Sequence, residues 1–134
     1  MDVGKGEVLS VRTPDEVVLI RQAVRKWAIE VGFSIVDQTK VVTAASELAR
    51  NAVIYAGGGT VTINLVTNAG RKGLRLIFAD KGPGIPDISL ALKDGYTTGN
   101  GLGLGLSGSK RLMNELDIVS KVGEGTTITA FKWK

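Results

Sequence analysis

Glu47 and Asn51 lie four residues apart in the stretch Glu-Leu-Ala-Arg-Asn, and their types and spacing are suited to chemistry. Residues four apart on a helix project from the same face, one turn above one another. A carboxylate that can take up a proton and an amide oxygen that can bind a hard cation would then share one patch. A solvated polar stripe on a surface helix would show the same spacing, so the pair alone leaves both interpretations open.

A second suggestive stretch is Asp80-Lys81-Gly82-Pro83-Gly84, which begins where an apolar run ends. A carboxylate at the end of a strand can accept a hydrogen bond from the exocyclic amine of a base. The glycines at 82 and 84 would let a flat ring lie against the backbone. An ordinary turn is the alternative for this stretch taken by itself.

Glycine occupies every second position from Gly99 to Gly105. Backbone N–H groups freed by glycine just before a helix form a natural cradle for phosphates, and a flexible loop is the weaker alternative. Gly103, Gly105 and Gly108 also match G-x-G-x-x-G, but no strand precedes them, which argues against a dinucleotide site. The chain has no P-loop motif, so phosphate binding would rely on this loop and a metal.

Periodic apolar residues indicate the elements that position these stretches. A long helix that begins near Ser34 carries Glu47 and Asn51, and Gly57-Gly58-Gly59 ends it. Alternating residues predict an antiparallel hairpin with one buried face on either side of Asn68–Gly73. The apolar residues of its strands are Val61, Ile63, Leu65, Leu74, Leu76 and Phe78.

The remaining elements complete a two-layer pattern. We expect an edge strand over Glu7–Arg12, and a helix that begins with a capping box at Thr13-Pro14-Asp15-Glu16 and ends at Gly32. Periodicity is lost from Asp80 to Gly105. A helix over about Leu104–Leu116 and a closing hairpin, Ile118–Val122 with Thr127–Trp133, follow. Three helices on one face of a mainly antiparallel, mixed sheet of about five strands make an α+β two-layer sandwich.

Composition narrows the function classes. The 134 residues suit one domain, 1–134, and the absence of an apolar run near 18 residues argues against a membrane span. With no cysteine, no disulfide framework is possible and a cytoplasmic location fits. The absence of histidine excludes histidine-based acid–base catalysis and a phosphohistidine on this chain. The net charge of +4 is modest and aromatic residues are few, so no nucleic-acid partner is expected, and an acidic protein surface is the better electrostatic partner.

Taken together, the three stretches resemble the GHKL (Bergerat-fold) ATP-binding superfamily, with its helix box, D-x-G-x-G box and glycine-rich box in order. The resemblance covers about the whole chain and implies the Bergerat fold, with ATP and Mg²⁺ bound. It implies that Glu47 is the general base and Asn51 the magnesium ligand. It also assigns adenine recognition to Asp80, Gly82 and Gly84. The phosphate loop would be Gly101, Gly103 and Gly105, and Thr126 the late-strand threonine that supports adenine through water.

Within this superfamily, the stretches SELARNAVIYAGGG, DKGPGIPD and GLGLGLSGSKRLM look most like the small kinases that regulate anti-sigma pathways, above all the stressosome switch kinases. The resemblance implies a serine/threonine kinase that phosphorylates a STAS-domain protein and, when released, activates a PP2C-type phosphatase. Two alternatives remain: an anti-sigma factor that sequesters a sigma factor, and a nucleotide-gated binding module without transfer activity.

Overall fold

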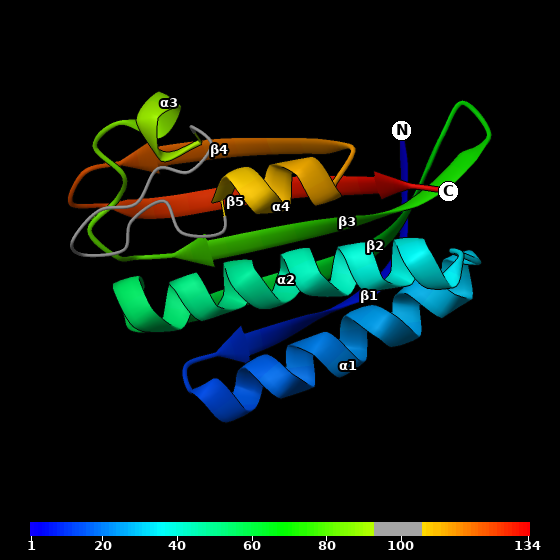
Figure 1. The fold of residues 1–134 in the computed structure, drawn as a ribbon, viewed down its shortest axis with the longest axis horizontal. Coiled ribbons are helices and arrows are strands. Elements are labelled where there is room, and N and C mark those ends of the chain that lie inside the picture. Colours follow the sequence, from blue (N-terminus) through cyan, green and yellow to red (C-terminus); the bar gives the residue numbers. More distant parts are fainter. Residues whose placement is uncertain (93–105) are drawn as a thin grey trace.

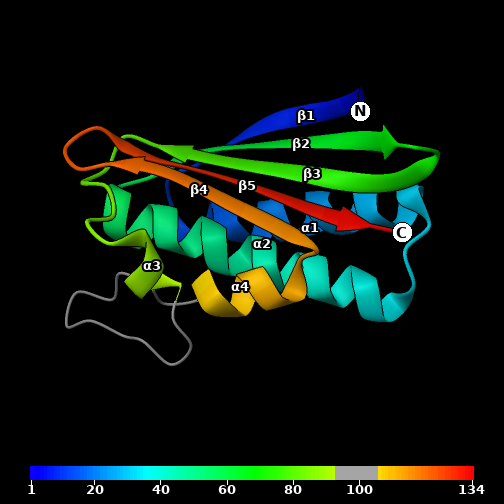
Figure 2. The same ribbon diagram turned by 90° about the horizontal axis from the view of Figure 1, so that it is seen from above.

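The computed structural model describes residues 1–92 and 106–134, which form two layers (Figures 1 and 2). One layer is an antiparallel sheet with strand order β1-β2-β3-β5-β4, and Figure 2 shows the helices on one side of it. The predicted α+β sandwich is confirmed, with β1 at an edge as expected. The elements are β1 (Asp2–Val11), α1 (Pro14–Val31), α2 (Ile35–Ala56), β2 (Gly59–Asn68), β3 (Arg71–Asp80), α3 (Ile88–Ala91), α4 (Leu106–Leu112), β4 (Glu115–Lys121) and β5 (Gly125–Trp133).

The long helices begin and end at the residues that the sequence indicates. Thr13 caps α1, because its side chain accepts a hydrogen bond from Glu16 N, and Gly32 ends α1 in the left-handed conformation. Ser34 caps α2 in the same way through Asp37 N, and Gly57 ends it. One detail differs from an ideal capping box: the shortest hydrogen bond to the Glu16 carboxylate comes from Arg12 N, at 2.8 Å, one residue before the cap.

The central hairpin is tighter than predicted. The expected loop Asn68–Gly73 shrinks to the two residues Ala69 and Gly70, because β2 and β3 stay paired out to Asn68 and Arg71. Ala69 and Gly70 both have positive φ, which is the conformation of a two-residue turn between right-twisted strands. Because β2 and β3 pair along their whole length, Asp80 lies at the opposite end of the hairpin from this turn, beside α2.

The first strand begins earlier than predicted, at Asp2, and its pairing with β2 shifts register between Val3 and Gly6. A Cβ at Gly6 would lie 1.8 Å from the carbonyl oxygen of Ile63, so only glycine fits this approach. The weak alternation of the first residues gave no signal for this irregular start.

The C-terminal third needs two corrections. The predicted helix to Leu116 ends at Leu112, because Asn114 N already donates to Phe131 O and begins the path into β4. The buried side chain of Lys132 on β5 fixes this helix end, with Nζ 3.0 Å from Leu112 O. Leu116 therefore belongs to β4, which spans Glu115–Lys121 instead of 118–122, and β5 begins at Gly125 instead of Thr127.

A short helix, α3, interrupts the stretch that the sequence indicates to be without periodic structure. Asp87 caps it, with its side chain accepting from Leu90 N at 3.0 Å. The core lies between the helices and the sheet, where fully buried residues of α1 and α2 meet those of β2 and β3. Its members of 2% exposure or less include Ile20, Val24, Val41, Leu48, Val61, Ile63, Leu74 and Leu76.

Candidate functional site

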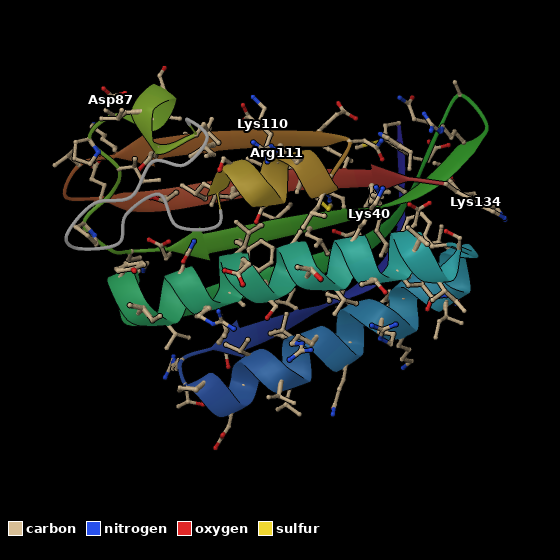
Figure 3. All side chains as sticks on the ribbon, in the orientation of Figure 1. Lys40, Asp87, Lys110, Arg111 and Lys134 are labelled. Atoms are coloured by element: carbon tan, nitrogen blue, oxygen red, sulfur yellow. The ribbon has the colours of Figure 1, made fainter. Side chains whose placement is uncertain are left out.

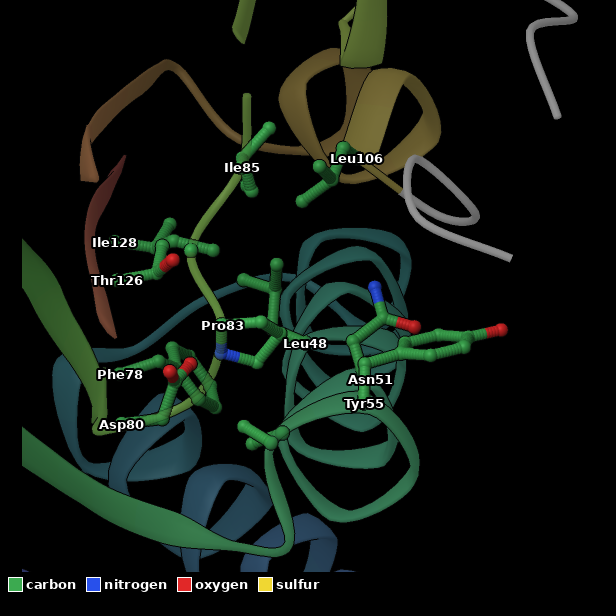
Figure 4. A pocket seen from close by; sticks show the side chains of 13 residues that line it. Leu48, Asn51, Tyr55, Phe78, Asp80, Pro83, Ile85, Leu106, Thr126 and Ile128 are labelled. Carbon is green, nitrogen blue, oxygen red and sulfur yellow. The ribbon is translucent and has the colours of Figure 1, made fainter. Parts of the chain in front are cut away.

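A pocket opens between α2 and the ends of β3 and β5, and the start of α4 closes one side (Figure 4). Figure 4 shows Asn51 and Tyr55 on the α2 wall, with Phe78, Asp80 and Thr126 on the sheet wall. Most of the lining is apolar, and the few polar groups come from both walls. The lining residues are Leu48, Asn51, Ala52, Tyr55, Ala56, Phe78, Asp80, Pro83, Gly84, Ile85, Leu106, Thr126 and Ile128.

Strand register brings the polar groups of the sheet wall together. Asp80 on β3 pairs with Thr126 on β5, and Thr126 pairs in turn with Ser120 on β4. Paired residues of antiparallel strands project from the same face of the sheet, so these three side chains form one row. Two of them, Asp80 and Thr126, line the pocket.

The Asp80 carboxylate is oriented by the loop that follows it. Its Oδ1 accepts a hydrogen bond from Gly82 N at 2.9 Å, which closes a turn of the type that aspartate favours. This bond engages one carboxylate oxygen. The side chain is half-buried at the pocket wall, where a carboxylate has the acceptor capacity for a further donor such as an exocyclic amine.

Glycine at 82 and 84 keeps this loop close to its neighbours. A Cβ at Gly82 would lie 2.5 Å from the Cβ of Ala56, in the last turn of α2. Gly84 has a φ of 79°, and a Cβ there would lie 2.5 Å from the carbonyl oxygen of Lys121. Larger residues would push the loop away from α2 at Gly82 and away from the end of β4 at Gly84.

Ser120 is a site residue that the sequence analysis missed. Its Oγ accepts from Ile85 N at 2.8 Å and lies 2.7 Å from Thr126 Oγ1, so it joins the loop after β3 to the buried threonine. A serine in a polar alternating strand carries no signal by itself. Its position beside Thr126 follows only from the pairing of β4 with β5, and that register cannot be known until the first residue of β4 is known.

The α2 wall carries the other predicted pair. Asn51 lines the pocket, and Glu47 lies one turn earlier on the same helix, half-buried and outside the lining. The Glu47 carboxylate forms an ion pair with Arg50, with 3.3 Å between Oε1 and Nη1. The structure thus brings Asn51, Asp80 and Thr126 to one pocket and places Glu47 beside it.

The predicted phosphate-loop glycines, Gly101, Gly103 and Gly105, lie outside the described residues. The first described residue after them, Leu106, begins α4 and lines the pocket.

These residues fit a nucleotide with a flat base. The apolar walls suit a flat ring, and the loop with Gly82 and Gly84 leaves room for it. The Asp80 carboxylate and the buried Thr126 hydroxyl can hydrogen-bond the polar edge of that ring. Among residues 1–92 and 106–134, no three acidic, histidine or cysteine residues cluster as a metal site. The amide oxygen of Asn51 would suit Mg²⁺, which takes hard oxygen ligands and usually keeps phosphates and water among them.

Comparison with known proteins identifies the family. Residues 36–134 match the family model described as histidine kinase-, DNA gyrase B- and HSP90-like ATPase. The chain is 50% identical to serine/threonine-protein kinase RsbT of Bacillus subtilis (strain 168), over 92% of each chain. It is 33% identical to the anti-sigma F factor of Geobacillus stearothermophilus, over 69% of this chain and 66% of that one.

The chain therefore belongs to the GHKL family of ATPases, as the sequence predicts. Within that family it is an enzyme of the serine/threonine protein kinase type, similar to RsbT. The RsbU and RsbW domains of a Mycobacterium tuberculosis protein share the fold, with a TM-score of 0.62 and 21% identity over 96% of this chain and 33% of that one. No helix in the described part of the chain is long and apolar enough to cross a membrane.

Proposed function

We propose that this kinase transfers the terminal phosphoryl group of ATP, with Mg²⁺, to a serine or threonine of a STAS-domain protein. The acceptor would belong to a bacterial stress-response pathway that works by partner switching. The observation that carries the proposal is the placement of Glu47 and Asn51. Asn51 lines the pocket, whereas Glu47 lies one turn away on a surface that a protein can approach.

The sheet wall would hold the base of the nucleotide. Asp80 is held by Gly82 N and can accept a hydrogen bond from the adenine amine. Thr126, supported by Ser120, would complete the polar edge through water, while Gly82 and Gly84 leave the ring its space. Gly101, Gly103 and Gly105 would offer backbone N–H groups to the phosphates.

Asn51 would be the protein ligand of the magnesium ion. When bound, Mg²⁺ neutralises phosphate charge and helps to align the terminal phosphoryl group. Glu47 would accept the proton of the incoming hydroxyl. In this step the acceptor oxygen forms a bond to the terminal phosphorus, the bond to the bridging oxygen of ADP breaks, and ADP leaves with that electron pair.

Release of the kinase from its substrate complex would let it activate a PP2C-type phosphatase. This part of the proposal rests on the likeness to RsbT and to the RsbW-containing structure, which fits partner switching in general. A single domain over 1–134 and a cytoplasmic location complete the proposed setting.

Transfer of label tests the proposal directly. The purified chain is incubated with terminally labelled Mg-ATP and a STAS-domain protein from the same organism. We expect label on a serine or threonine of the acceptor, and its loss in Glu47→Ala with nucleotide affinity kept. Glu30→Ala is the matched control, because Glu30 is also a helix-surface glutamate in an exposed ion pair, with Lys5. Equal loss of transfer and of nucleotide binding in Glu47→Ala would contradict the role of Glu47.

A second candidate function is sequestration of a sigma factor, which the likeness to the anti-sigma F factor supports. Co-purification separates the two, because a sigma factor in the complex favours sequestration and a STAS-domain protein favours the switch kinase. Nucleotide binding with no transfer to any acceptor would instead favour a nucleotide-gated binding module.

A further inference from the structure

One side of α2 carries a regular stripe of residues that the core does not use. We call it the outer stripe and define it as Val36, Lys40, Thr43, Glu47, Arg50 and Ile54. The spacing alternates between four and three residues, so the six side chains follow one line along the helix. All of them are exposed except Glu47, which is half-buried.

The rest of α2 does the packing. Its buried residues are Val41, Val42, Ala44, Ala45, Ser46, Leu48, Ala49 and Ala52, and they face the sheet, α1 and α4. Val36 and Ile54 are 63% and 57% exposed, which leaves apolar surface at both ends of the outer stripe. Such side chains contribute little to folding where they stand, and single exposed apolar residues are common on protein surfaces, so the charges of the stripe carry the argument.

Among the described residues, most of the charged side chains around the outer stripe are basic. Lys40 and Arg50 flank Glu47 within the outer stripe, and Lys110 and Arg111 lie on α4, which packs against α2. Figure 3 shows Lys40, Lys110 and Arg111 on the same helix-bearing side of the molecule. The nearby acid Asp37 is engaged with the buried Lys132, at 3.7 Å. The basic surface therefore surrounds a single stripe carboxylate, that of Glu47.

Arg50 and Glu47 hold one another through a contact that is easily exchanged. Their side chains are 54% and 35% exposed, and ion pairs this open to solvent are weak. A carboxylate from another protein can take the place of Glu47 beside Arg50 at little cost. The Glu47 carboxylate is then free to face an incoming hydroxyl.

We propose that the outer stripe is the docking surface for the protein substrate and that it takes an acidic segment of that substrate. This proposal rests on the proposed function and names its partner surface. One substrate carboxylate engages Arg50 and releases Glu47, and a second one engages Lys40. Lys40 and Glu47 are seven residues apart, so the second carboxylate lies about 10 Å from the acceptor hydroxyl along the helix.

Binding and transfer are measured together to test this inference. The probe is a purified STAS-domain protein of the same organism, titrated onto the full chain with a non-hydrolysable ATP analogue. We expect Lys40→Glu to weaken this binding, and to raise KM for the acceptor, at least about tenfold, equal to about 1.4 kcal/mol. Nucleotide affinity should stay within twofold of wild type.

Lys72→Glu is the matched control, since Lys72 is an exposed lysine on the β2–β3 hairpin rather than on the helical side. It should leave binding and transfer unchanged. Added salt should weaken acceptor binding in wild type and have less effect in Lys40→Glu. Reversal of an acceptor carboxylate to lysine should restore binding to Lys40→Glu if the charges meet.

The outcomes separate this inference from the proposed function. Acceptor binding that Lys40→Glu leaves unchanged overturns the docking surface, even where label transfer in wild type supports the kinase. Weakened binding in Lys40→Glu supports the docking surface whether or not transfer occurs. The sedimentation coefficient of the chain alone is compared between wild type and Lys40→Glu. A difference would mean that the outer stripe is an interface between two copies, which would overturn the inference. A wild-type chain that binds no STAS-domain protein overturns both proposals.

Discussion

At the pocket wall, Asp80, Thr126 and Ser120 lie on three neighbouring strands. Asp80 and Ser120 each accept a hydrogen bond from the loop after β3, and Ser120 is also hydrogen-bonded to Thr126. On the helical surface, Glu47 and Arg50 form an ion pair that remains open to solvent. Backbone geometry fixes the positions of the wall residues, so small substitutions there should have large effects on stability and nucleotide binding. Charge in solvent governs the second set, so its effects should be smaller and should depend on salt or pH.

The largest effect should follow from Gly125→Ala at the wall. Gly125 has a φ of 119°, and a Cβ would lie 2.1 Å from the carbonyl oxygen of Asp80. The left-handed backbone costs about 1–2 kcal/mol for alanine, and the clash adds about 1–3 kcal/mol. Urea unfolding should show the loss, and nucleotide titration should show weaker binding because Asp80 must shift.

Gly123→Ala is the control that separates the steric clash of Gly125→Ala from the strain of the left-handed backbone. Gly123 has a φ of 82°, and no described residue other than its chain neighbours has an atom within 4 Å of the position that a Cβ would take. Alanine at this position therefore costs only the strain of the left-handed backbone. Equal losses of stability in the two glycine variants would mean that the approach of Gly125 to Asp80 does not constrain the wall.

Asp80→Asn should have the next largest effect, on nucleotide affinity rather than on folding. The asparagine oxygen can still accept from Gly82 N, but its NH₂ group would face the base amine and repel it. Loss of one hydrogen bond to a charged acceptor, about 1.5–3 kcal/mol, raises Kd for ATP about 10- to 100-fold. Isothermal titration calorimetry measures this.

Asp87→Asn is the control for that titration, because Asp87 caps α3 outside the pocket lining. Unchanged ATP affinity in Asp80→Asn would mean that the wall does not read the base through this carboxylate.

Ser120→Ala should have smaller effects, on both stability and ATP affinity. It removes the acceptor of Ile85 N and the partner of the Thr126 hydroxyl. An unsatisfied N–H costs about 1–3 kcal/mol of stability, and we expect ATP affinity to fall about fivefold, near 1 kcal/mol. Urea unfolding and nucleotide titration should detect both losses, and Ser120→Thr, which keeps the Oγ, should restore most of each.

Ser89→Ala on α3 controls for loss of a hydroxyl at an exposed serine. If Ser120→Ala behaved like Ser89→Ala, the row Asp80–Thr126–Ser120 would not act as a unit.

The same contrast explains how far the sequence could predict the structure. Helix caps at Thr13 and Ser34 and the alternation of Val61 and Ile63 depend on local residue types, and those elements were predicted with small errors. The sequence likewise predicts the family and the α+β sandwich. Local patterns sufficed for these features because each cap or strand face is decided by its immediate neighbours.

Features that depend on pairing between distant segments were not predicted. The helix expected to reach Leu116 ends at Leu112 because Asn114 pairs with Phe131, seventeen residues later along the chain. Ser120 was missed for the same reason, since only its register with Thr126 marks it. The roles of Glu47 and Asn51 stay predictions, and their shared position by the pocket is what makes them testable.

The smallest of the four effects should come from Glu16, a half-buried acid in the first turn of α1. The backbone N–H of Arg12 lowers the pKa of the Glu16 carboxyl below its ordinary value, with a further hydrogen bond from Ser10. A carboxyl with a lower pKa in the folded state stabilises the fold above its unfolded pKa. This stabilisation is lost as pH falls through the folded pKa.

Glu16→Gln should therefore lower stability slightly at pH 7 and make no difference at a pH below both pKa values. Urea unfolding of wild type and variant at the two pH values measures the difference. Asp15→Asn is the control, because Asp15 shares the first turn of α1 and its dipole but is not the acceptor for Arg12 N. A pH dependence that Asp15→Asn removes as fully as Glu16→Gln would assign the effect to the helix dipole. A loss in Glu16→Gln larger than that in Ser120→Ala would reverse the contrast between wall and surface.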